Sequence, residues 1–182
     1  MILKYDNNLS LELLSAKHAE QIFHLVEGNR VHLREWLPWV DHMKTLGQFQ
    51  QFIFTSMQRW EAGSEISFMI MQNDIAIGRV GIYHIDAYNK IGSIGYWLGK
   101  DFSGQGLITK ACSLLTDYAF EKMNLNRIEI KCGTKNNKSK AIAERLQFTQ
   151  EGIIRQGEFV NDSFIDLYLF SMLKHEWAGI SK

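Results

Sequence analysis

The stretch that decides the fold is GYWLGKDFSGQGLIT, residues 95–109. An apolar strand pattern ends at Leu98, a short loop carries Gly104 and Gly106, and a long helical pattern follows. The first amides of a helix have no partner inside it, and the helix dipole adds partial positive charge there. Glycines let the backbone come close to a ligand. The stretch therefore predicts a phosphate site at a helix N-terminus.

Two other phosphate-binding loops do not fit these residues. The Walker pattern needs a glycine where the chain has Ile94, and the dinucleotide fingerprint needs a third glycine where it has Thr109. A lone Gly-x-Gly is also compatible with a helix start that only needs tight packing. Only the elements around the glycine loop can therefore show whether it is a ligand site or a packing feature.

Strand and helix patterns are mixed along the chain. Alternating apolar residues predict seven strands, at residues 9–14, 66–71, 75–85, 91–99, 127–132, 149–156 and 164–173. Helical spacing predicts helices at residues 17–27, 46–62, 105–123 and 136–146, with a short aromatic helix or turn at 31–40. Hairpin signals at both ends argue against an all-parallel sheet. We expect the α/β (α+β) class, with a mixed, mostly antiparallel seven-stranded sheet covered by helices on both faces.

Composition places the chain among ordinary globular proteins. Its 182 residues, 46% hydrophobic and 22% charged, predict one domain spanning residues 1–182. Twenty Lys and Arg balance twenty Asp and Glu, which gives no electrostatic case for nucleic acid or a membrane surface. No signal-peptide or membrane-spanning pattern is visible. We expect a cytoplasmic protein in which Cys112 and Cys132 are reduced core residues.

Three segments together resemble the GNAT acetyltransferase superfamily. The loop DFSGQG (101–106) is similar to its Gln/Arg-x-x-Gly-x-Gly/Ala motif, with Asp101 at the first place. The stretches NNKS (136–139) and RLQF (145–148) resemble its Asn-x-x-Ser…Lys-Leu-Gly-Phe helix. The departures, Asp101 included, are mild because the loop works mainly through backbone amides.

Two further segments resemble the RimJ/RimL branch, the ribosomal-protein N-terminal acetyltransferases. They are HLREWLPW (32–39) and GYWL (95–98), and the whole resemblance runs from about residue 9 to residue 173. It implies the GNAT fold, in which the strand ending at Leu98 and the strand 127–132 splay apart.

The resemblance also implies how acetyl-CoA is bound. The pantetheine arm lies in the opening and bonds the backbone of Tyr96, Trp97 and Leu98 like an extra strand. Asn136 bonds that arm, or only caps the following helix. Lys135, Lys138 and Lys140 either reach the nucleotide or form a solvated face. The pyrophosphate is held by amides along the loop and the helix start, at Ser103, Gly104, Gln105, Gly106, Leu107, Ile108 and Thr109.

Direct acetyl transfer needs a base for the amine, a donor to the oxyanion and a group that receives the thiolate. By resemblance, the Leu98 amide is the oxyanion donor. Ser139 is the general acid and a cofactor contact, or a helix-start serine bonded to its own backbone. It is favoured because Ala143 occupies the place where many relatives carry a tyrosine. Glu158 is the base and an acceptor contact, or an ordinary surface carboxylate.

Trp36 and Trp39 flank Pro38 and either form a lip over the acceptor or simply pack. The histidines and cysteines show no metal spacing, so we expect no metal. We expect an N-acetyltransferase that uses acetyl-CoA as co-substrate and acetylates a primary amine, foremost a protein α-amino group such as that of a ribosomal protein. The alternatives are a small amine (a polyamine or an aminoglycoside) and a non-catalytic CoA-binding sensor. The family and the exposed aromatic ends also suggest a homo-oligomer.

Overall fold

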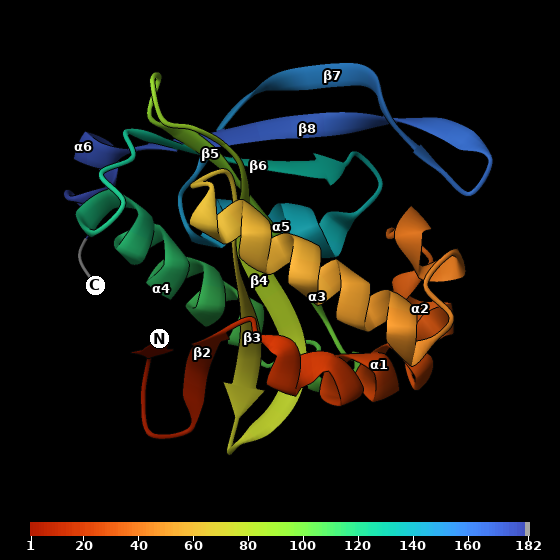
Figure 1. Cartoon of the computed structure of the whole chain (residues 1–182). Helices are drawn as coiled ribbons and strands as arrows, with labels where there is room; N and C mark the ends of the chain where they lie inside the picture. Colours follow the sequence, from red (N-terminus) through yellow and green to blue (C-terminus); the bar gives the residue numbers. More distant parts are fainter. Residues whose placement is uncertain (181–182) are drawn as a thin grey trace.

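The computed structural model describes residues 1–180, and one eight-stranded sheet organises them. Neighbouring strands are antiparallel except for one parallel pair, the fifth and sixth strands of the chain. The class predicted from the sequence is therefore confirmed (Figure 1). In sheet order the strands are β1 (Ile2–Lys4), β2 (Leu9–Leu13), β3 (Ile66–Gln72), β4 (Ile75–Asp86), β5 (Ile91–Leu98), β6 (Arg127–Gly133), β8 (Ser163–Leu173) and β7 (Thr149–Val160).

The predicted count of seven strands was wrong by one. The missing strand is β1, which lies at the sheet edge and pairs with β2 through Ile2–Glu12, Leu3–Leu11 and Lys4–Ser10. A three-residue strand is too short to show alternation. Its formation depends on the neighbouring strand offering an edge rather than on a local pattern.

The helices carry the rest of the ordered chain. They are α1 (Ala19–Glu27), α2 (Arg30–Leu33), α3 (Leu46–Glu61), α4 (Leu107–Glu121), α5 (Asn137–Arg145) and α6 (Lys174–Trp177), with 3-10 turns at Ala16–His18, Pro38–Asp41 and Lys100–Phe102. The aromatic segment predicted at residues 31–40 forms two short helices, because Pro38 starts a helical turn but cannot continue one.

Tight turns join both hairpins where the sequence predicts them. Asn73 and Asp74 connect β3 to β4, and Asn161 and Asp162 connect β7 to β8. All four residues have positive φ, between 47° and 65°. Two successive left-handed residues match the twist of antiparallel strands, and Asn and Asp tolerate that conformation well.

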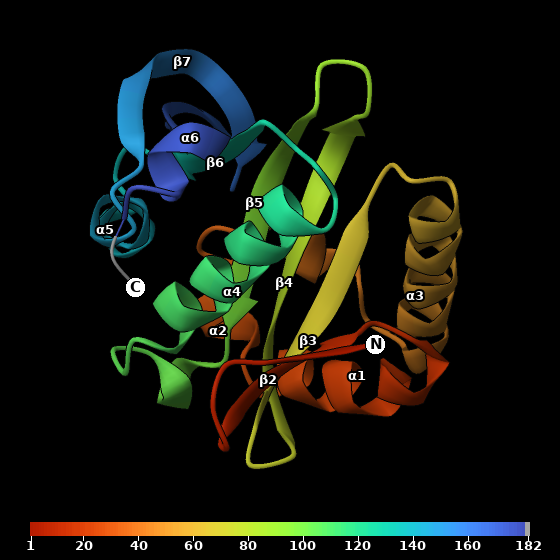
Figure 2. The same cartoon turned by 90° about the vertical axis from the view of Figure 1, so that its left-hand side faces the viewer.

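Helices cover both faces of the sheet. Figure 2 shows α4 on one side and α1 with α3 on the other. The core under α4 contains its predicted apolar stripe, including Ala111 and Leu115, while Ile22 and Phe49 lie in the core on the opposite face. Both cysteines are free and buried.

The central strands splay as the GNAT resemblance implies. β5 and β6 pair only from Ile91–Arg127 to Ile94–Ile130. Beyond that point β5 stays paired with β4 as far as Leu98, and β6 stays paired with β8 as far as Gly133. Each strand follows its outer neighbour, so a gap opens between their ends.

Close backbone packing fixes the end of β5. A Cβ atom on Gly78, the β4 partner of Leu98, would lie 2.3 Å from the Trp97 carbonyl oxygen. We predict that Gly78→Ala lowers the free energy of unfolding by roughly 1–3 kcal/mol, because the added methyl overpacks the strand pair. Gly47→Ala is the control, since nothing lies within 4 Å of its Cβ position on α3. Urea denaturation that shows equal losses for both variants would contradict the prediction.

Candidate active site

A cavity of about 530 Å³ lies where β5 and β6 diverge. Five parts of the chain line it: the end of β5, the loop and first turn of α4, the segment from β6 into α5, the α2 region, and the β7–β8 hairpin. The predicted site residues on its wall are Trp36, Tyr96, Trp97, Leu98, Ser103, Ile108, Lys135, Asn136, Lys138, Ser139 and Glu158. The remaining ones lie on the loop beside it or outside it.

The N-terminus of α4 faces this cavity without a cap. Ser103 and Ile108 line the wall, and no side chain within residues 1–180 caps the helix. Gly104 and Gly106 are exposed with φ of +81° and +75°, and a Cβ on either would meet nothing within 4 Å. The left-handed Gly106 delays the helix start to Leu107, two residues later than the pattern predicts. The first-turn amides thus point outward with open space before them.

Asn136 acts as the N-cap of α5. Its Oδ1 accepts a hydrogen bond from the Ser139 amide at 3.0 Å. The same residue lines the cavity, so the cap and a ligand contact are compatible. This cap fixes the first turn of α5 and with it the backbone of Ser139.

The Ser139 hydroxyl meets the Tyr96 hydroxyl across the splay. Their oxygen atoms are 2.9 Å apart, and the Tyr96 hydroxyl is also 3.3 Å from the Ser139 carbonyl oxygen. The Tyr96 ring is half-buried, but its hydroxyl lies in the interior, and burial raises its pKa far above the usual value. Sequence reasoning gave Tyr96 a backbone role only and missed this side-chain contact.

A β-bulge directs Glu158 to the cavity. Ile154 pairs with Leu167, and the next pair is Glu158 with Ile165, so β7 advances four residues while β8 advances two. The Asp166 carboxylate accepts a hydrogen bond from the Gln156 amide at 2.7 Å inside the bulge. Bulges of this kind redirect side chains next to functional sites.

The environment of Glu158 changes its acidity. Glu158 lies on the cavity wall, and partial burial raises the pKa of its carboxyl group above the ordinary value. Much of its surface remains exposed, so the group stays within reach of solvent. A carboxylate with a raised pKa and solvent access is suited to accept a proton.

The β7–β8 hairpin reaches over to α2. The Asn161 side-chain amide donates to the carbonyl oxygens of Arg34 (3.2 Å) and Glu35 (3.3 Å). Figure 1 shows the hairpin tip extending toward α2, which forms the opposite wall. This contact joins the hairpin to the segment that follows α2, and residues of both lie on the cavity wall.

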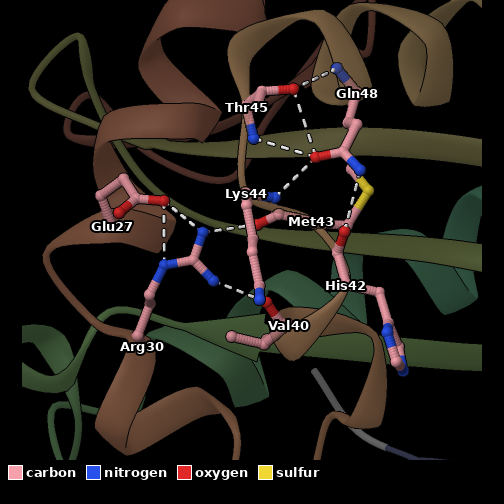
Figure 3. A network of polar contacts seen from close by, with 8 residues as sticks. All are labelled: Glu27, Arg30, Val40, His42, Met43, Lys44, Thr45 and Gln48. Carbon is pink, nitrogen blue, oxygen red and sulfur yellow. Dashed lines mark hydrogen bonds and ion pairs between the residues drawn. The ribbon is translucent and has the colours of Figure 1, made fainter.

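Arg30 holds the α2 wall in place. Its guanidinium donates to the Glu27 carboxylate and to the carbonyl oxygens of Val40 and Met43 (Figure 3). These partners lie before and after α2 in the chain, so one side chain ties the loop to the end of α1. Such a contact network orders a segment that has little regular structure of its own.

The two predicted tryptophans separate in the structure. Trp36 lines the cavity, and its ring lies 3.0 Å from the Cβ position of Gly133. Trp39 packs against Trp97 in the core under α1 and α3, with ring centroids 6.1 Å apart. Trp39 is therefore placed for packing and does not lie on the cavity wall.

The lysines are divided in the same way. Lys135 and Lys138 line the cavity. Lys140 instead pairs with Glu144 at 3.3 Å and lies 5.3 Å from the Tyr168 ring centroid. The structure thus brings two of the three predicted lysines to the wall.

His32 lines the cavity, but sequence reasoning did not select it. Burial, followed by the nearby Lys138 charge, lowers the pKa of its imidazole. The ring is therefore mainly neutral at pH 7. His32 precedes Trp36 by four residues, and this helical spacing was the signal that could have identified it.

The described part of the chain offers neither a metal cluster nor a membrane-spanning helix. Within residues 1–180, no group of three or more His, Cys, Asp or Glu side chains could hold a metal ion. No helix in that part of the chain is both long enough and apolar enough to cross a membrane.

The cavity wall therefore carries three chemically distinct groups. An uncapped helix tip offers amide donors to an anion, a paired serine and tyrosine offer hydroxyls, and a carboxylate of raised pKa stands near the opposite wall. Such an arrangement suits a phosphate-bearing donor molecule that meets an amine.

Comparison with known proteins agrees with this geometry. The YdaF protein of Bacillus subtilis, provisionally named a ribosomal N-acetyltransferase, is 34% identical over 177 residues, 97% of each chain. The ribosomal-protein-serine acetyltransferase of Escherichia coli is 29% identical over 171 residues, covering 94% of this chain and 96% of that one.

A solved structure also agrees with this geometry. The structure of RimL, a ribosomal L7/L12 alpha-N-protein acetyltransferase in complex with coenzyme A, has a TM-score of 0.92 and 25% identity. It covers 95% of this chain and 98% of its own. The model of the acetyltransferase (GNAT) domain family matches residues 8–149. That span takes in the splayed strands, the glycine loop and α5, and the chain belongs to the GNAT acetyltransferase family.

Proposed function

We propose that this chain transfers the acetyl group of acetyl-CoA directly to the α-amino group of a protein N-terminus, such as that of a ribosomal protein. One observation carries the proposal: an uncapped helix tip, the Ser139 hydroxyl and the Glu158 carboxylate all border one cavity between two splayed strands. RimL is named a ribosomal L7/L12 alpha-N-protein acetyltransferase, and the Escherichia coli relative is named a ribosomal-protein-serine acetyltransferase.

The donor half of the cavity fits acetyl-CoA. Beyond Ile94 the cavity side of β5 has no pairing with β6, so the backbone from Tyr96 to Leu98 can bond an amide-bearing arm like an extra strand. The amides from Ser103 to Thr109 suit a pyrophosphate. The coenzyme A in the RimL structure supports this assignment.

Three groups of the protein then have separate roles in the reaction. Glu158 takes the proton of the acceptor amine, directly or through one water. The Leu98 amide stabilises the negative charge that develops on the acetyl oxygen. Ser139 faces the sulfur of the donor. These roles need no metal and no acyl-enzyme.

The charges on the cavity wall as a whole favour a chain end over a polycation. Three lysines, Lys131, Lys135 and Lys138, line the cavity beside two carboxylates, Glu35 and Glu158. A polyamine with several positive charges would meet repulsion there. Residues of the hairpin and of the α2 region line the cavity together, which suits an extended substrate lying between them.

We further propose that residues 1–182 act as one domain in the cytoplasm and self-associate, without binding nucleic acid or membranes. Support for self-association comes from Phe159 and Phe164, which are more than half exposed on the hairpin with ring centroids 4.9 Å apart. Light scattering coupled to size-exclusion chromatography measures the mass of the particle directly.

An acceptor panel tests the proposed function. Labelled acetyl-CoA is incubated with the protein and N-terminal peptides of ribosomal proteins, and mass spectrometry locates the label. We expect the label on the α-amine, and none on peptides with a blocked N-terminus and a free lysine. Faster turnover of spermidine or an aminoglycoside would favour the small-amine alternative. Binding of acetyl-CoA without turnover of any acceptor would favour a sensor.

Gly104 tests the phosphate site. We predict that Gly104→Ala raises the dissociation constant for acetyl-CoA about 10-fold, because the methyl keeps a phosphate from the amides. Gly63→Ala is the control: its φ of +70° and open surroundings match those of Gly104, but it ends α3. Both variants should lose roughly 1–2 kcal/mol of stability from the left-handed backbone. Equal affinities by calorimetry would remove Gly104 from the donor site.

Glu158 tests the base. We predict that Glu158→Gln lowers kcat/KM about 100-fold while acetyl-CoA affinity stays within about two-fold. The base form is lost as pH falls through the raised pKa of Glu158, so the acid limb of the wild-type profile lies above the ordinary pKa of a glutamate carboxyl group. That limb should vanish in the variant. Glu144→Gln, on the far part of α5, is the control and should keep the wild-type profile.

A further inference from the structure

We infer that Tyr96 is the positioning residue that aims the Ser139 hydroxyl at the sulfur of the acyl donor. The inference rests on the proposed acetyl transfer and adds a role for a side chain, since the family resemblance implied only a backbone contact at Tyr96. It also changes the role of Ser139 from an acid that gives up its proton to a hydrogen-bond donor.

Ser139 is held from two directions. Asn136 accepts the hydrogen bond of its backbone amide at 3.0 Å, which fixes its position in the first turn of α5. Tyr96 reaches it from β5, on the other side of the splay, with 2.9 Å between the hydroxyl oxygens. A serine hydroxyl rotates freely unless a partner fixes it. Tyr96 is that partner.

The direction of this hydrogen bond follows from burial. Burial raises the pKa of Tyr96, so the phenol keeps its proton throughout the working range and must donate it to an acceptor. The nearer of its two acceptors is the Ser139 hydroxyl oxygen at 2.9 Å, against 3.3 Å for the carbonyl oxygen. When Ser139 accepts from Tyr96, its own hydrogen points elsewhere. Both residues line the cavity, which is the open direction.

Two buried thiols lie near the pair, and the Ser139 side chain also lies within hydrogen-bond reach of Cys132, on which the charges of Lys140 and Glu144 act in opposite directions. Cys112 and Cys132 are the titratable groups that affect Tyr96, and burial raises the pKa of both thiols. Both stay neutral at pH 7 and do not attract the tyrosine proton. A neutral thiol is only a weak acceptor for the Ser139 hydrogen, so the hydrogen-bond donors run from Tyr96 through Ser139 to the cavity.

The acidities of the hydroxyls and the thiol determine whether Tyr96 and Ser139 transfer a proton to sulfur or only donate hydrogen bonds to it. A thiol has a pKa of about 8.5 and a tyrosine about 10, and an aliphatic hydroxyl is weaker still. Moving a proton from Ser139 or Tyr96 to a thiolate is thus uphill. In the transfer, the carbon–sulfur bond breaks with its electron pair on sulfur, the nitrogen–carbon bond forms, and the amine proton goes to Glu158. The two hydroxyls keep their protons and stabilise the charge on sulfur by hydrogen bonding.

A double-mutant cycle tests the inference. Tyr96→Phe removes one oxygen, and we expect kcat to fall about 10-fold with KM for acetyl-CoA within about two-fold. Ser139→Ala should lose a similar factor, and adding Tyr96→Phe to it should lose nothing more. The alkaline limb of the pH profile should not move, since Tyr96 does not titrate. Tyr118→Phe, a half-buried tyrosine on α4 that packs edge-on against Phe68, is the control and should keep the wild-type kcat.

Several outcomes would overturn the inference: an unchanged kcat in Tyr96→Phe, additive losses in the double variant, or an effect on KM alone. Thermal unfolding of each variant checks the fold. A second variant replaces Tyr96 by 3-fluorotyrosine, which keeps the ring and donates more strongly. It should match or exceed the wild-type kcat, and a lower kcat would count against the role.

The failure of this inference differs from that of the proposed function. The cycle is measured with whichever amine the wild-type protein acetylates fastest, so a small-amine acceptor leaves the Tyr96 test intact. A wild-type protein that acetylates nothing overturns both proposals. Normal wild-type turnover with additive losses overturns only the role of Tyr96.

Discussion

The end of pairing between β5 and β6 is the constraint on which the site depends. After Ile94 and Ile130 each strand keeps its outer neighbour and leaves its inner edge unpaired. Backbone N–H and C=O groups away from water need partners, so an unpaired edge inside a protein must be satisfied by solvent or a ligand. A pantetheine arm carries amides at a suitable spacing. Under the proposed function, this gap supplies the recognition surface for the donor.

Much of the fold could be predicted from the sequence, because many of its elements depend on local preferences. The alternation in residues 127–132, the apolar stripe of α4 and the two Asn/Asp turns each have a period or a backbone preference that needs no distant partner. Gly104 and Gly106 indicated a helix N-terminus that a ligand can approach closely. The splay itself came from family resemblance, because no periodicity records where two strands stop pairing.

Features set by distant contacts could not be read in the same way. Strand β1 exists because β2 offers an edge, and three residues show no pattern. The Tyr96–Ser139 contact joins residues 43 apart. The direction of Glu158 depends on a bulge that Asp166 holds from the opposite strand. Trp39 packs against Trp97, and the residues near Trp39 in the sequence do not reveal this contact.

The tie between the hairpin tip and α2 has an evolutionary consequence. Asn161 joins two segments that lie apart from the glycine loop, and its partners are carbonyl oxygens, which any residue at those positions provides. The α2 loop and the hairpin, Glu158 excepted, can therefore vary in sequence without changing the glycine loop. Proteins with this fold can thus change their acceptor preference through substitutions in these surface segments. Their thioester chemistry stays the same.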